Sequence, residues 1–284
     1  MTTIVNISGY KFIHLRNLTH IQQRLKQHCI ADKLKGTILL SEEGININLA
    51  GRSTEILRFK TFLATQNDLA GICFKESYSE IIPFKKMSVK IKKEIIMLGT
   101  PTAPATDTQQ HSISPKQLKQ WLDEGKPLTL FDTRNNYETL LGTFNSAVTL
   151  NINFFSELPS AIQDLTSLQD QKPVVMFCTG GIRCEKVLPL LLQQGLQSIY
   201  QLEGGILNYF AECGGSHYQG ECFVFDERIA LNSQLEVSGA VLCFVCQQPV
   251  SVLEQDSDHF QQGKFCPRCV DKAEGRLPEK LNSM

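Results

Sequence analysis

Hydrophobic residues in the first hundred positions recur at a spacing that predicts two amphipathic helices. The second helix is predicted over residues 54–65, with Ser53 as its N-cap because a serine hydroxyl accepts a hydrogen bond from the first turn. The first helix is predicted over residues 18–34, where the apolar positions are Leu18, Ile21, Leu25, Cys29 and Ile30.

Four short apolar runs around these helices predict strands. They cover residues 3–7, 36–41, 45–50 and 72–77, and a Glu-Glu-Gly turn separates the second run from the third. The order strand-helix-strand-strand-helix-strand is that of a ferredoxin-like α+β sandwich. We therefore predict a ferredoxin-like domain over residues 1–98.

Residues 99–114 are rich in Pro, Thr and Gln and have no apolar period, so they predict a linker. Strands and helices alternate again after it, which predicts a parallel sheet covered on both faces, in an α/β domain over residues 115–215. Ser114 and Pro115 form an N-cap and first-turn pair that opens a helix reaching residue 122. Strands are predicted over residues 128–132, 148–152, 173–177 and 198–202, and helices over residues 159–168 and 184–194.

Composition and charge narrow the class of protein. The 284 residues suffice for about two compact domains and a small third. Because no apolar run approaches the roughly 18 residues of a membrane span and no signal-peptide pattern begins the chain, we expect a cytoplasmic protein. Residues 1–100 carry 15 Lys/Arg against 8 Asp/Glu (+7), whereas residues 101–284 carry 13 against 21 (−8). This asymmetry favours a polyanionic partner, with ordinary variation between domains as the alternative.

The basic excess includes a lysine-rich segment that follows the predicted ferredoxin-like domain's last strand. Within an extended segment, Lys90 and Lys92 would lie on one face, and Val89 and Ile91 on the other. Such a strand could bind a phosphate backbone, or it could be a charged edge that resists aggregation. The candidate residues for binding a nucleic acid or another polyanion are Lys85, Lys86, Lys90, Lys92 and Lys93.

The strongest candidate for chemistry is Cys178, which directly follows the apolar run 173–177. The carboxyl end of a strand is where open α/β sheets place their sites. Gly180 and Gly181 allow the loop to curl so that backbone N–H groups point at the sulfur, and Arg183 with the following helix N-terminus adds positive potential. Each effect favours the thiolate, so we predict a nucleophilic or sulfur-carrying cysteine.

Two other interpretations of this loop stay open. A buried cysteine can be a small core residue, although Cys-x-Gly-Gly-x-Arg is hard to explain by packing alone. Cysteine phosphatases place five residues between Cys and Arg, whereas four separate Cys178 from Arg183; the smaller loop favours sulfur chemistry over phosphoester hydrolysis. Cys184 follows immediately and could resolve a persulfide on Cys178 as a disulfide, or face the sheet as a small residue.

Residues 216–284 are Cys-rich and too few for a strong core of their own. Two Cys-x-x-Cys pairs, separated by nineteen residues, have the spacing of one tetrahedral zinc site with a structural role. Free thiols or redox pairs are the alternative. The predicted ligands are Cys243, Cys246, Cys266 and Cys269, and His259 between the pairs is expected at the surface.

Several motifs resemble one known family. Residues 131–138 resemble the acidic signature of rhodanese domains, in which an Asp ends a strand and the Arg and Glu brace the catalytic loop; here these are Asp132, Arg134 and Glu138. Residues 201–206 resemble the segment after a rhodanese active site. Residues 41–46, 84–94, 178–186 and 220–228 resemble the rhodanese-domain tRNA uridine(34) hydroxylases. Departures are Ile47, where a small residue is common, and Tyr218, where Trp is usual.

The resemblance implies 5-hydroxylation of the wobble uridine of certain tRNAs, with molecular oxygen as the oxygen source and a persulfide on Cys178. The residues alone do not indicate how oxygen would be activated, because the sequence shows no flavin fingerprint and no convincing two-His-one-carboxylate iron site. The electron donor is not given by the sequence. A thiosulfate-type sulfurtransferase or sulfur carrier is the alternative enzyme. A binding module without catalysis is the third class, which the intact Cys178 and Arg183 disfavour.

Overall fold

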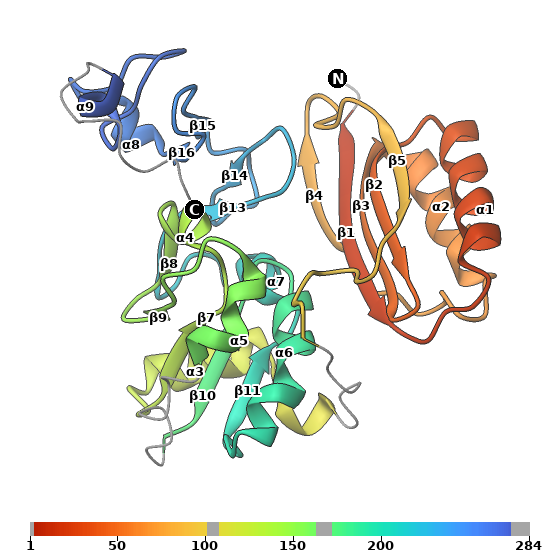
Figure 1. Ribbon diagram of the computed structural model, residues 1–284, viewed down its shortest axis with the longest axis horizontal. Helices are drawn as coiled ribbons and strands as arrows, with labels where there is room; N and C mark the ends of the chain where they lie inside the picture. Colours follow the sequence, from red (N-terminus) through yellow and green to blue (C-terminus); the bar gives the residue numbers. More distant parts are fainter. Residues whose placement is uncertain (1–2, 101–107, 163–171, 274–284) are drawn as a thin grey trace.

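The computed structural model describes residues 3–100, 108–162 and 172–273. They form an N-terminal domain, a central parallel α/β domain and a small Cys-rich region (Figure 1). In the N-terminal domain one antiparallel sheet in the order β4-β1-β3-β2 is extended by β5, which pairs in parallel with β2. The elements are β1 (Ile4–Phe12), α1 (Leu18–Ala31), β2 (Lys35–Ser41), β3 (Gly44–Arg52), α2 (Ser53–Ala64), β4 (Lys75–Ser79) and β5 (Met87–Ile91).

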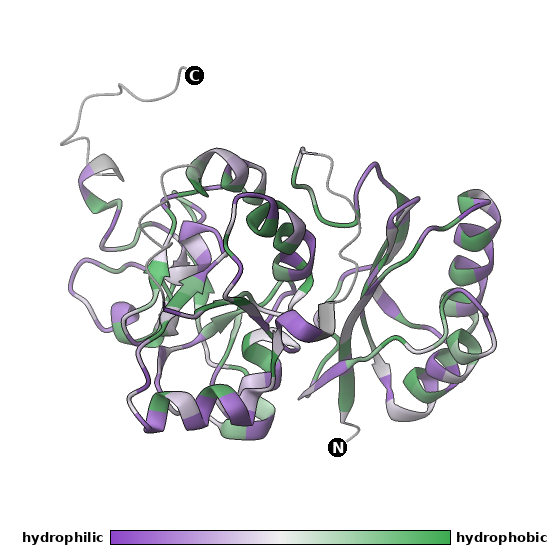
Figure 2. Cartoon of the chain, turned by 90° about the horizontal axis from the view of Figure 1, so that it is seen from below, coloured by the Kyte–Doolittle hydropathy of each residue, from purple (hydrophilic) through white to green (hydrophobic). Residues whose placement is uncertain are grey.

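Both helices of the N-terminal domain cover the same face of this sheet. Every second strand residue, such as Ile7 and Ile47, packs against Leu25 and Phe59 of the helices. Figure 2 shows the helices as alternating hydrophobic and hydrophilic segments on the side away from the central domain. The opposite sheet face is turned toward the rest of the chain. This is the predicted ferredoxin-like sandwich.

One local prediction in this domain is wrong. Ser53 is the first residue of α2 and not its N-cap; the carboxylate of Glu55 accepts a hydrogen bond from the Arg52 N–H at 2.9 Å instead. The alternation predicted for the lysine-rich segment is seen in β5, where Val89 is buried and Lys90 is exposed; Ile91, the last residue of this strand, is 40% exposed.

The central domain has a parallel sheet in the order β6-β11-β10-β7-β9. Helices α5 and α6 cover one face, where Val187 and Leu188 are buried, and α3 and α7 cover the other, where Leu118 and Ile206 are buried. The elements are β6 (Ser112–Ile113), α3 (Pro115–Asp123), β7 (Thr129–Asp132), α4 (Asn136–Thr139), β8 (Gly142–Phe144), β9 (Val148–Thr149), α5 (Leu158–Ala161), β10 (Val174–Phe177), α6 (Ile182–Gln193), β11 (Ile199–Leu202) and α7 (Gly205–Cys213).

Some predicted boundaries in this domain differ from the structure. The predicted linker ends in a 3-10 turn (Thr108–His111) and in β6, which pairs with β11; two-residue pairing leaves no periodic pattern to detect. β9 stops at Thr149, so the predicted strand over residues 148–152 is too long. Most of the helix predicted over residues 159–168 lies outside the described residues.

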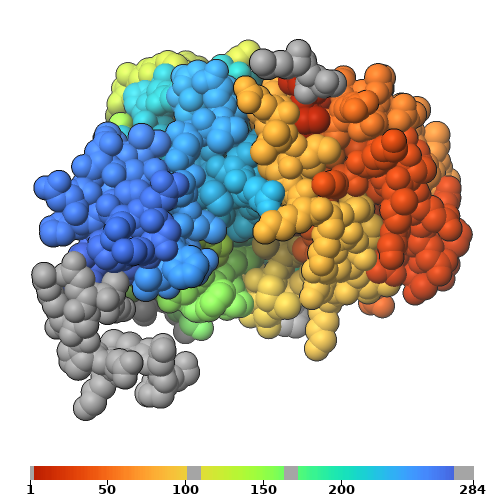
Figure 3. All heavy atoms as spheres, turned by 90° about the horizontal axis from the view of Figure 1, so that it is seen from above, coloured from red at the N-terminus to blue at the C-terminus, as the bar shows by residue number. Residues whose placement is uncertain are grey.

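The chain after α7 first returns to the central domain and then forms the Cys-rich region. β12 (Tyr218–Gly220) pairs with β8, and the short pairs β13 (Cys222–Phe223) with β14 (Ala230–Leu231) and β15 (Val241–Leu242) with β16 (Pro249–Val250) follow. The last helices are α8 (Val252–Gln255) and α9 (Val270–Ala273). Figure 3 shows the light-blue segment after β12 lying directly against the orange N-terminal domain. Arg228 Nη1 donates to Ser77 Oγ at 2.7 Å across this contact.

Candidate functional site

Cys178 lies where the buried strand β10 ends, and its side chain is fully buried. Gly181 has φ +96°, a left-handed conformation that glycine adopts without strain, and it turns the chain into α6. Because of this turn, the Gly181 N–H donates to Cys178 Sγ at 3.1 Å. The loop thus places the sulfur at the N-terminus of a twelve-residue helix.

The surroundings of Cys178 favour its thiolate. Burial alone raises the pKa of Cys178, but a hydrogen bond from Cys184, the positive charge of Arg183 and the N–H groups of Arg183 and Cys184 together lower this pKa to about 5. Burial and the hydrogen bond to Cys178 raise the pKa of Cys184. The Cys184 thiol also lies 3.6 Å from Thr133 Oγ1. Of the two sulfurs, Cys178 is therefore the one that loses its proton more readily.

Glu138 braces the loop from α4. Its two oxygens accept from Nη1 and Nη2 of Arg183 at 2.5 and 2.6 Å, and Thr179 Oγ1 donates to it at 3.2 Å. Glu138 and Arg183 are both buried, so each needs the other's charge. The pair fixes the loop, and it also offsets much of the charge that Arg183 brings to Cys178.

Asp132 and Arg134 form a second buried ion pair beside the first. Arg134 Nε and Nη2 donate to the Asp132 carboxylate at 2.9 and 2.6 Å, and Nη2 also donates to the Gly142 carbonyl at 2.7 Å. These contacts hold the segment between β7 and β8. Neither side chain contacts Cys178, so we assign them a supporting role.

A cavity of about 570 Å³ opens onto the Cys178 loop. One wall is the loop itself; the opposite wall is the uncovered face of the N-terminal sheet, and Val224 to Arg228 close a side. Odd-numbered residues of β1 and β3 face the helices, so their even-numbered neighbours face this cavity. The cavity wall formed by the sheet includes Asn6, Ser8, Tyr10, Thr37, Asn46, Asn48, Lys75 and Ser77.

The predicted polyanion-binding lysines lie on the outer edge of the same domain. Lys90 is on β5, Lys92 and Lys93 follow its end, and Lys85 and Lys86 precede it. All five side chains are exposed, and Lys92 also lines the mouth of the cavity. The structure therefore brings these lysines together on a surface that leads to Cys178.

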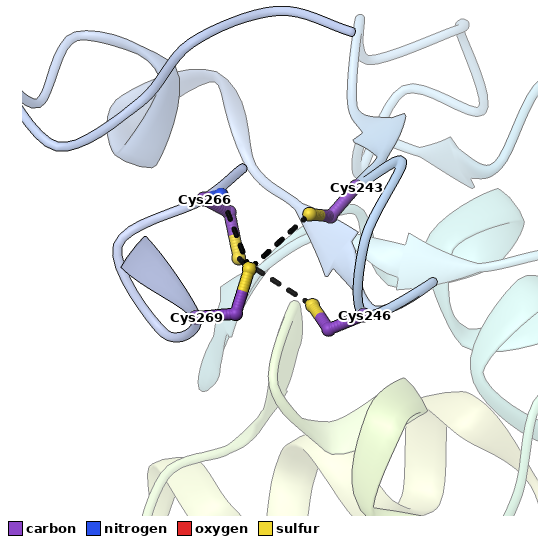
Figure 4. A group of neighbouring side chains, drawn as sticks. All are labelled: Cys243, Cys246, Cys266 and Cys269. Atoms are coloured by element: carbon purple, nitrogen blue, oxygen red, sulfur yellow. Dashed lines mark hydrogen bonds between the residues drawn. The ribbon is translucent and has the colours of Figure 1, made fainter. Parts of the chain in front are cut away.

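The four C-terminal cysteines converge on one point (Figure 4). Their sulfurs all lie within 4.8 Å of one another, which is compatible with binding one metal ion. The Sγ atoms of Cys243 and Cys269 are 3.6 Å apart, as are those of Cys246 and Cys266. These distances exceed a disulfide bond of about 2.05 Å by far. His259 is exposed and outside the cluster, as expected.

Comparisons with known proteins decide the family. Residues 4–95 match the UPF0176 acylphosphatase like domain, and residues 114–212 match the Rhodanese-like domain. A tRNA uridine(34) hydroxylase from Cupriavidus necator is 47% identical over 272 residues, which cover 94% of this chain and 96% of that protein. One from Ralstonia nicotianae is 44% identical, covering 94% of this chain and 97% of its own. This chain belongs to the tRNA uridine(34) hydroxylase family.

Membership of this family confirms the resemblance seen in the motifs, and the fold class agrees with both matched domains. Within the described residues, no helix has the length and apolar character needed to cross a membrane.

Contacts between the two domains escaped the sequence-based reasoning. Tyr10 Oη donates to Glu185 Oε2 at 2.8 Å, and a Cβ on Gly181 would lie 3.1 Å from that hydroxyl oxygen. Lys186 Nζ donates to both Glu43 oxygens at 2.9 Å and also pairs with Glu94. Glu185 and Lys186 belong to α6, so the helix that carries the Cys178 loop is clamped to the N-terminal domain. The only signal in the sequence was that Glu43, Glu94, Glu185 and Lys186 fall inside the family motifs; Tyr10 lies outside them.

Proposed function

We propose that this chain hydroxylates carbon 5 of the wobble uridine, position 34, of tRNA, and that Cys178 is its reactive group. The observation that carries the proposal is the cavity between the Cys178 thiolate and a polar sheet face of the basic N-terminal domain. Membership of a family whose relatives are named tRNA uridine(34) hydroxylase supports the substrate. Since the substrate is tRNA, we place the activity in the cytoplasm.

The cavity suits a base that has been turned out of the anticodon loop. Enzymes that modify a base hold it in a pocket by hydrogen bonds to its edge. Asn46 and Asn48, whose side chains share a hydrogen bond of 3.3 Å, place amide groups in the wall, and the buried sulfur lies on the opposite wall. Hydroxylation with molecular oxygen puts one oxygen atom into the C5–H bond. The second atom leaves as water, after taking two electrons from an external two-electron reductant and two protons.

A persulfide on Cys178 fits the same loop. The Gly181 N–H, the helix N-terminus and Arg183 stabilise negative charge on sulfur, whether it is a thiolate or the outer atom of a persulfide. Sulfurtransferase or sulfur-carrier activity is therefore the second candidate function. A sulfurtransferase of small molecules would not need the N-terminal wall, so transfer from thiosulfate to cyanide without tRNA modification would favour this alternative.

Removal of the lysine charges should weaken tRNA binding. We expect the triple variant Lys90→Ala, Lys92→Ala, Lys93→Ala to bind tRNA less tightly, because each lysine that contacts a phosphate releases counterions. Each lost contact should reduce the slope of log K against log salt by about 0.7–0.9. Titration of labelled tRNA at several salt concentrations measures both effects.

A control with the same change of net charge separates local contacts from overall charge. Replacing the exposed Lys116, Lys172 and Lys264 with Ala removes three charges outside the N-terminal domain. This control should lose far less affinity. If both triple variants behave alike, β5 is only a solvated edge strand.

We also propose that the metal at the cysteine cluster is zinc and that its role is structural. Four thiolates with Zn–S bonds of about 2.3 Å would place neighbouring sulfurs about 3.8 Å apart. The observed distances of 3.6 Å and, between Cys266 and Cys269, 3.7 Å are close to this value. Because four cysteines close the shell, no position is left for a substrate.

Metal analysis tests the zinc proposal. Protein purified without chelator should contain about one zinc per chain, and Cys243→Ser should lower that amount because one of four ligands is lost. Cys213→Ser, outside the cluster, should leave it unchanged. Zinc loss should expose the C-terminal region to proteolysis and leave alkylation of Cys178 intact. Metal-free protein with a protease-resistant C-terminal region would contradict the proposal.

A further inference from the structure

The N-terminal sheet places a lysine beside the Cys178 loop. Lys75 begins β4 opposite Ser8 in the register, so its side chain lies on the cavity face, and it lines the cavity together with Cys178. Its Cε is 3.1 Å from the position that a Cβ on Gly204 would take. The next residue, Gly205, lies so close to the Cys178 carbonyl oxygen that a Cβ there would be 2.4 Å away. Lys75 is thus held against the turn that supports the cysteine.

Lys75 differs from the other cations of the cavity because it is partly buried and yet has no ion-pair partner among the described residues. Arg183 pairs with Glu138, and Arg228 donates through Nε and Nη2 to Asp226 at 2.8 and 2.6 Å. Lys92 is exposed to solvent. Within the part of the chain that the structure describes, no carboxylate lies within ion-pair distance of Lys75.

The groups around Lys75 hold it without neutralising it. Its Nζ lies 5.1 Å from the centroid of the Tyr10 ring, a cation–π contact, while the Tyr10 hydroxyl is donated to Glu185. The titratable groups that face it are Cys73, Cys178, Glu185 and Tyr10. Burial lowers the pKa of Lys75, and negative charge on Cys178, Cys73 or Glu185 opposes that shift. A partly desolvated ammonium of this kind gains most from a nearby anion.

We propose that Lys75 supplies the uncompensated positive charge that stabilises anionic sulfur on Cys178, as the thiolate or as a persulfide. The inference rests on the proposed role of Cys178 as the reactive group. In this proposal the N-terminal domain has two roles. It binds tRNA, and it also contributes a charge to the electrostatic environment of the reactive sulfur. Lys75 is a positioning residue, since it acts through that sulfur.

The test is the pH profile of Cys178 alkylation by iodoacetamide in the full-length protein, read at that residue by peptide mass spectrometry. Lys75→Met should raise the midpoint of the profile by about one pH unit, the effect of losing a nearby charge. The rate at pH 5 should then fall about fivefold, while the plateau rate at high pH should not fall. Lys75→Arg, which keeps the charge, should restore the midpoint.

Controls separate charge from folding and from the proposed function. Lys26→Met makes the same change on the exposed side of α1, and its midpoint should match that of the unmodified chain. If Lys75→Met does not fold, Lys75→Gln keeps a polar head group and makes the same prediction. An unchanged midpoint in a folded variant, or a shift that Lys75→Arg also shows, would overturn the proposal. The assay needs neither tRNA nor oxygen, so it gives its answer even if hydroxylation fails.

Discussion

Cys178→Ser is expected to reduce hydroxylation of the wobble uridine to background while leaving the chain folded. Serine has nearly the same shape, so the buried loop keeps its packing, but its hydroxyl is not ionised where the Cys178 thiol has a pKa of about 5. Without an anion, the site has neither a nucleophile nor a carrier for sulfur. The measurement is 5-hydroxyuridine in tRNA incubated with each protein, together with the unfolding temperature.

The neighbouring cysteines serve as matched controls for this variant. Cys222→Ser changes another fully buried thiol, in β13, whose pKa burial raises to about 12, and activity should persist. Cys184→Ser should retain activity if Cys184 only faces the sheet, and should lose turnover but not the first alkylation if it resolves a persulfide. Full activity in Cys178→Ser would remove the proposed chemistry.

Glu138→Gln is expected to be the most destabilising conservative change in the central domain. Glutamine fills the same volume but leaves the Arg183 guanidinium buried without a counter-charge. Breaking one side of a buried ion pair costs about 3–5 kcal/mol of the free energy of unfolding. Denaturant unfolding measures this loss of stability. In the variant protein that stays folded, the pH profile for alkylation of Cys178 should be altered.

The partly exposed pair of Lys60 and Glu76 gives the comparison for this prediction. Glu76→Gln removes the same type of charge where solvent can compensate it, so its cost should stay below about 1 kcal/mol. Equal losses in the two variants would mean that Glu138 does not hold Arg183 in the way the contacts indicate.

The periodic parts of the fold were predictable because periodicity is a local property. The apolar spacing of residues 18–30 and the continuous run before Cys178 needed only neighbours in the sequence, and so did the two Cys-x-x-Cys turns. The exception is Ser53. It is the first residue of α2 and not its N-cap, and the Glu55 carboxylate accepts the hydrogen bond from the Arg52 N–H.

Only the local part of the candidate site could be predicted from the sequence, because the rest depends on contacts between distant residues. The loop from Cys178 to Arg183 has its own signature, and its curled backbone follows from two glycines. The opposite wall comes from a different domain. Alternation along β1 and β4 indicates that Tyr10 and Lys75 share a face, but not that this face packs over a cysteine more than a hundred residues later in the chain. The pairing of Arg183 with Glu138 depends likewise on the folded topology.

Nucleoside analysis of tRNA tests the central claim most directly. Cells that lack the gene for this chain would be compared with cells that regain it as the unmodified chain or as Cys178→Ser. We predict that 5-hydroxyuridine and nucleosides derived from it at position 34 fall in the deletion, return with the unmodified chain and stay low with Cys178→Ser. Unchanged levels in the deletion, in cells with no second enzyme of this activity, would contradict the account.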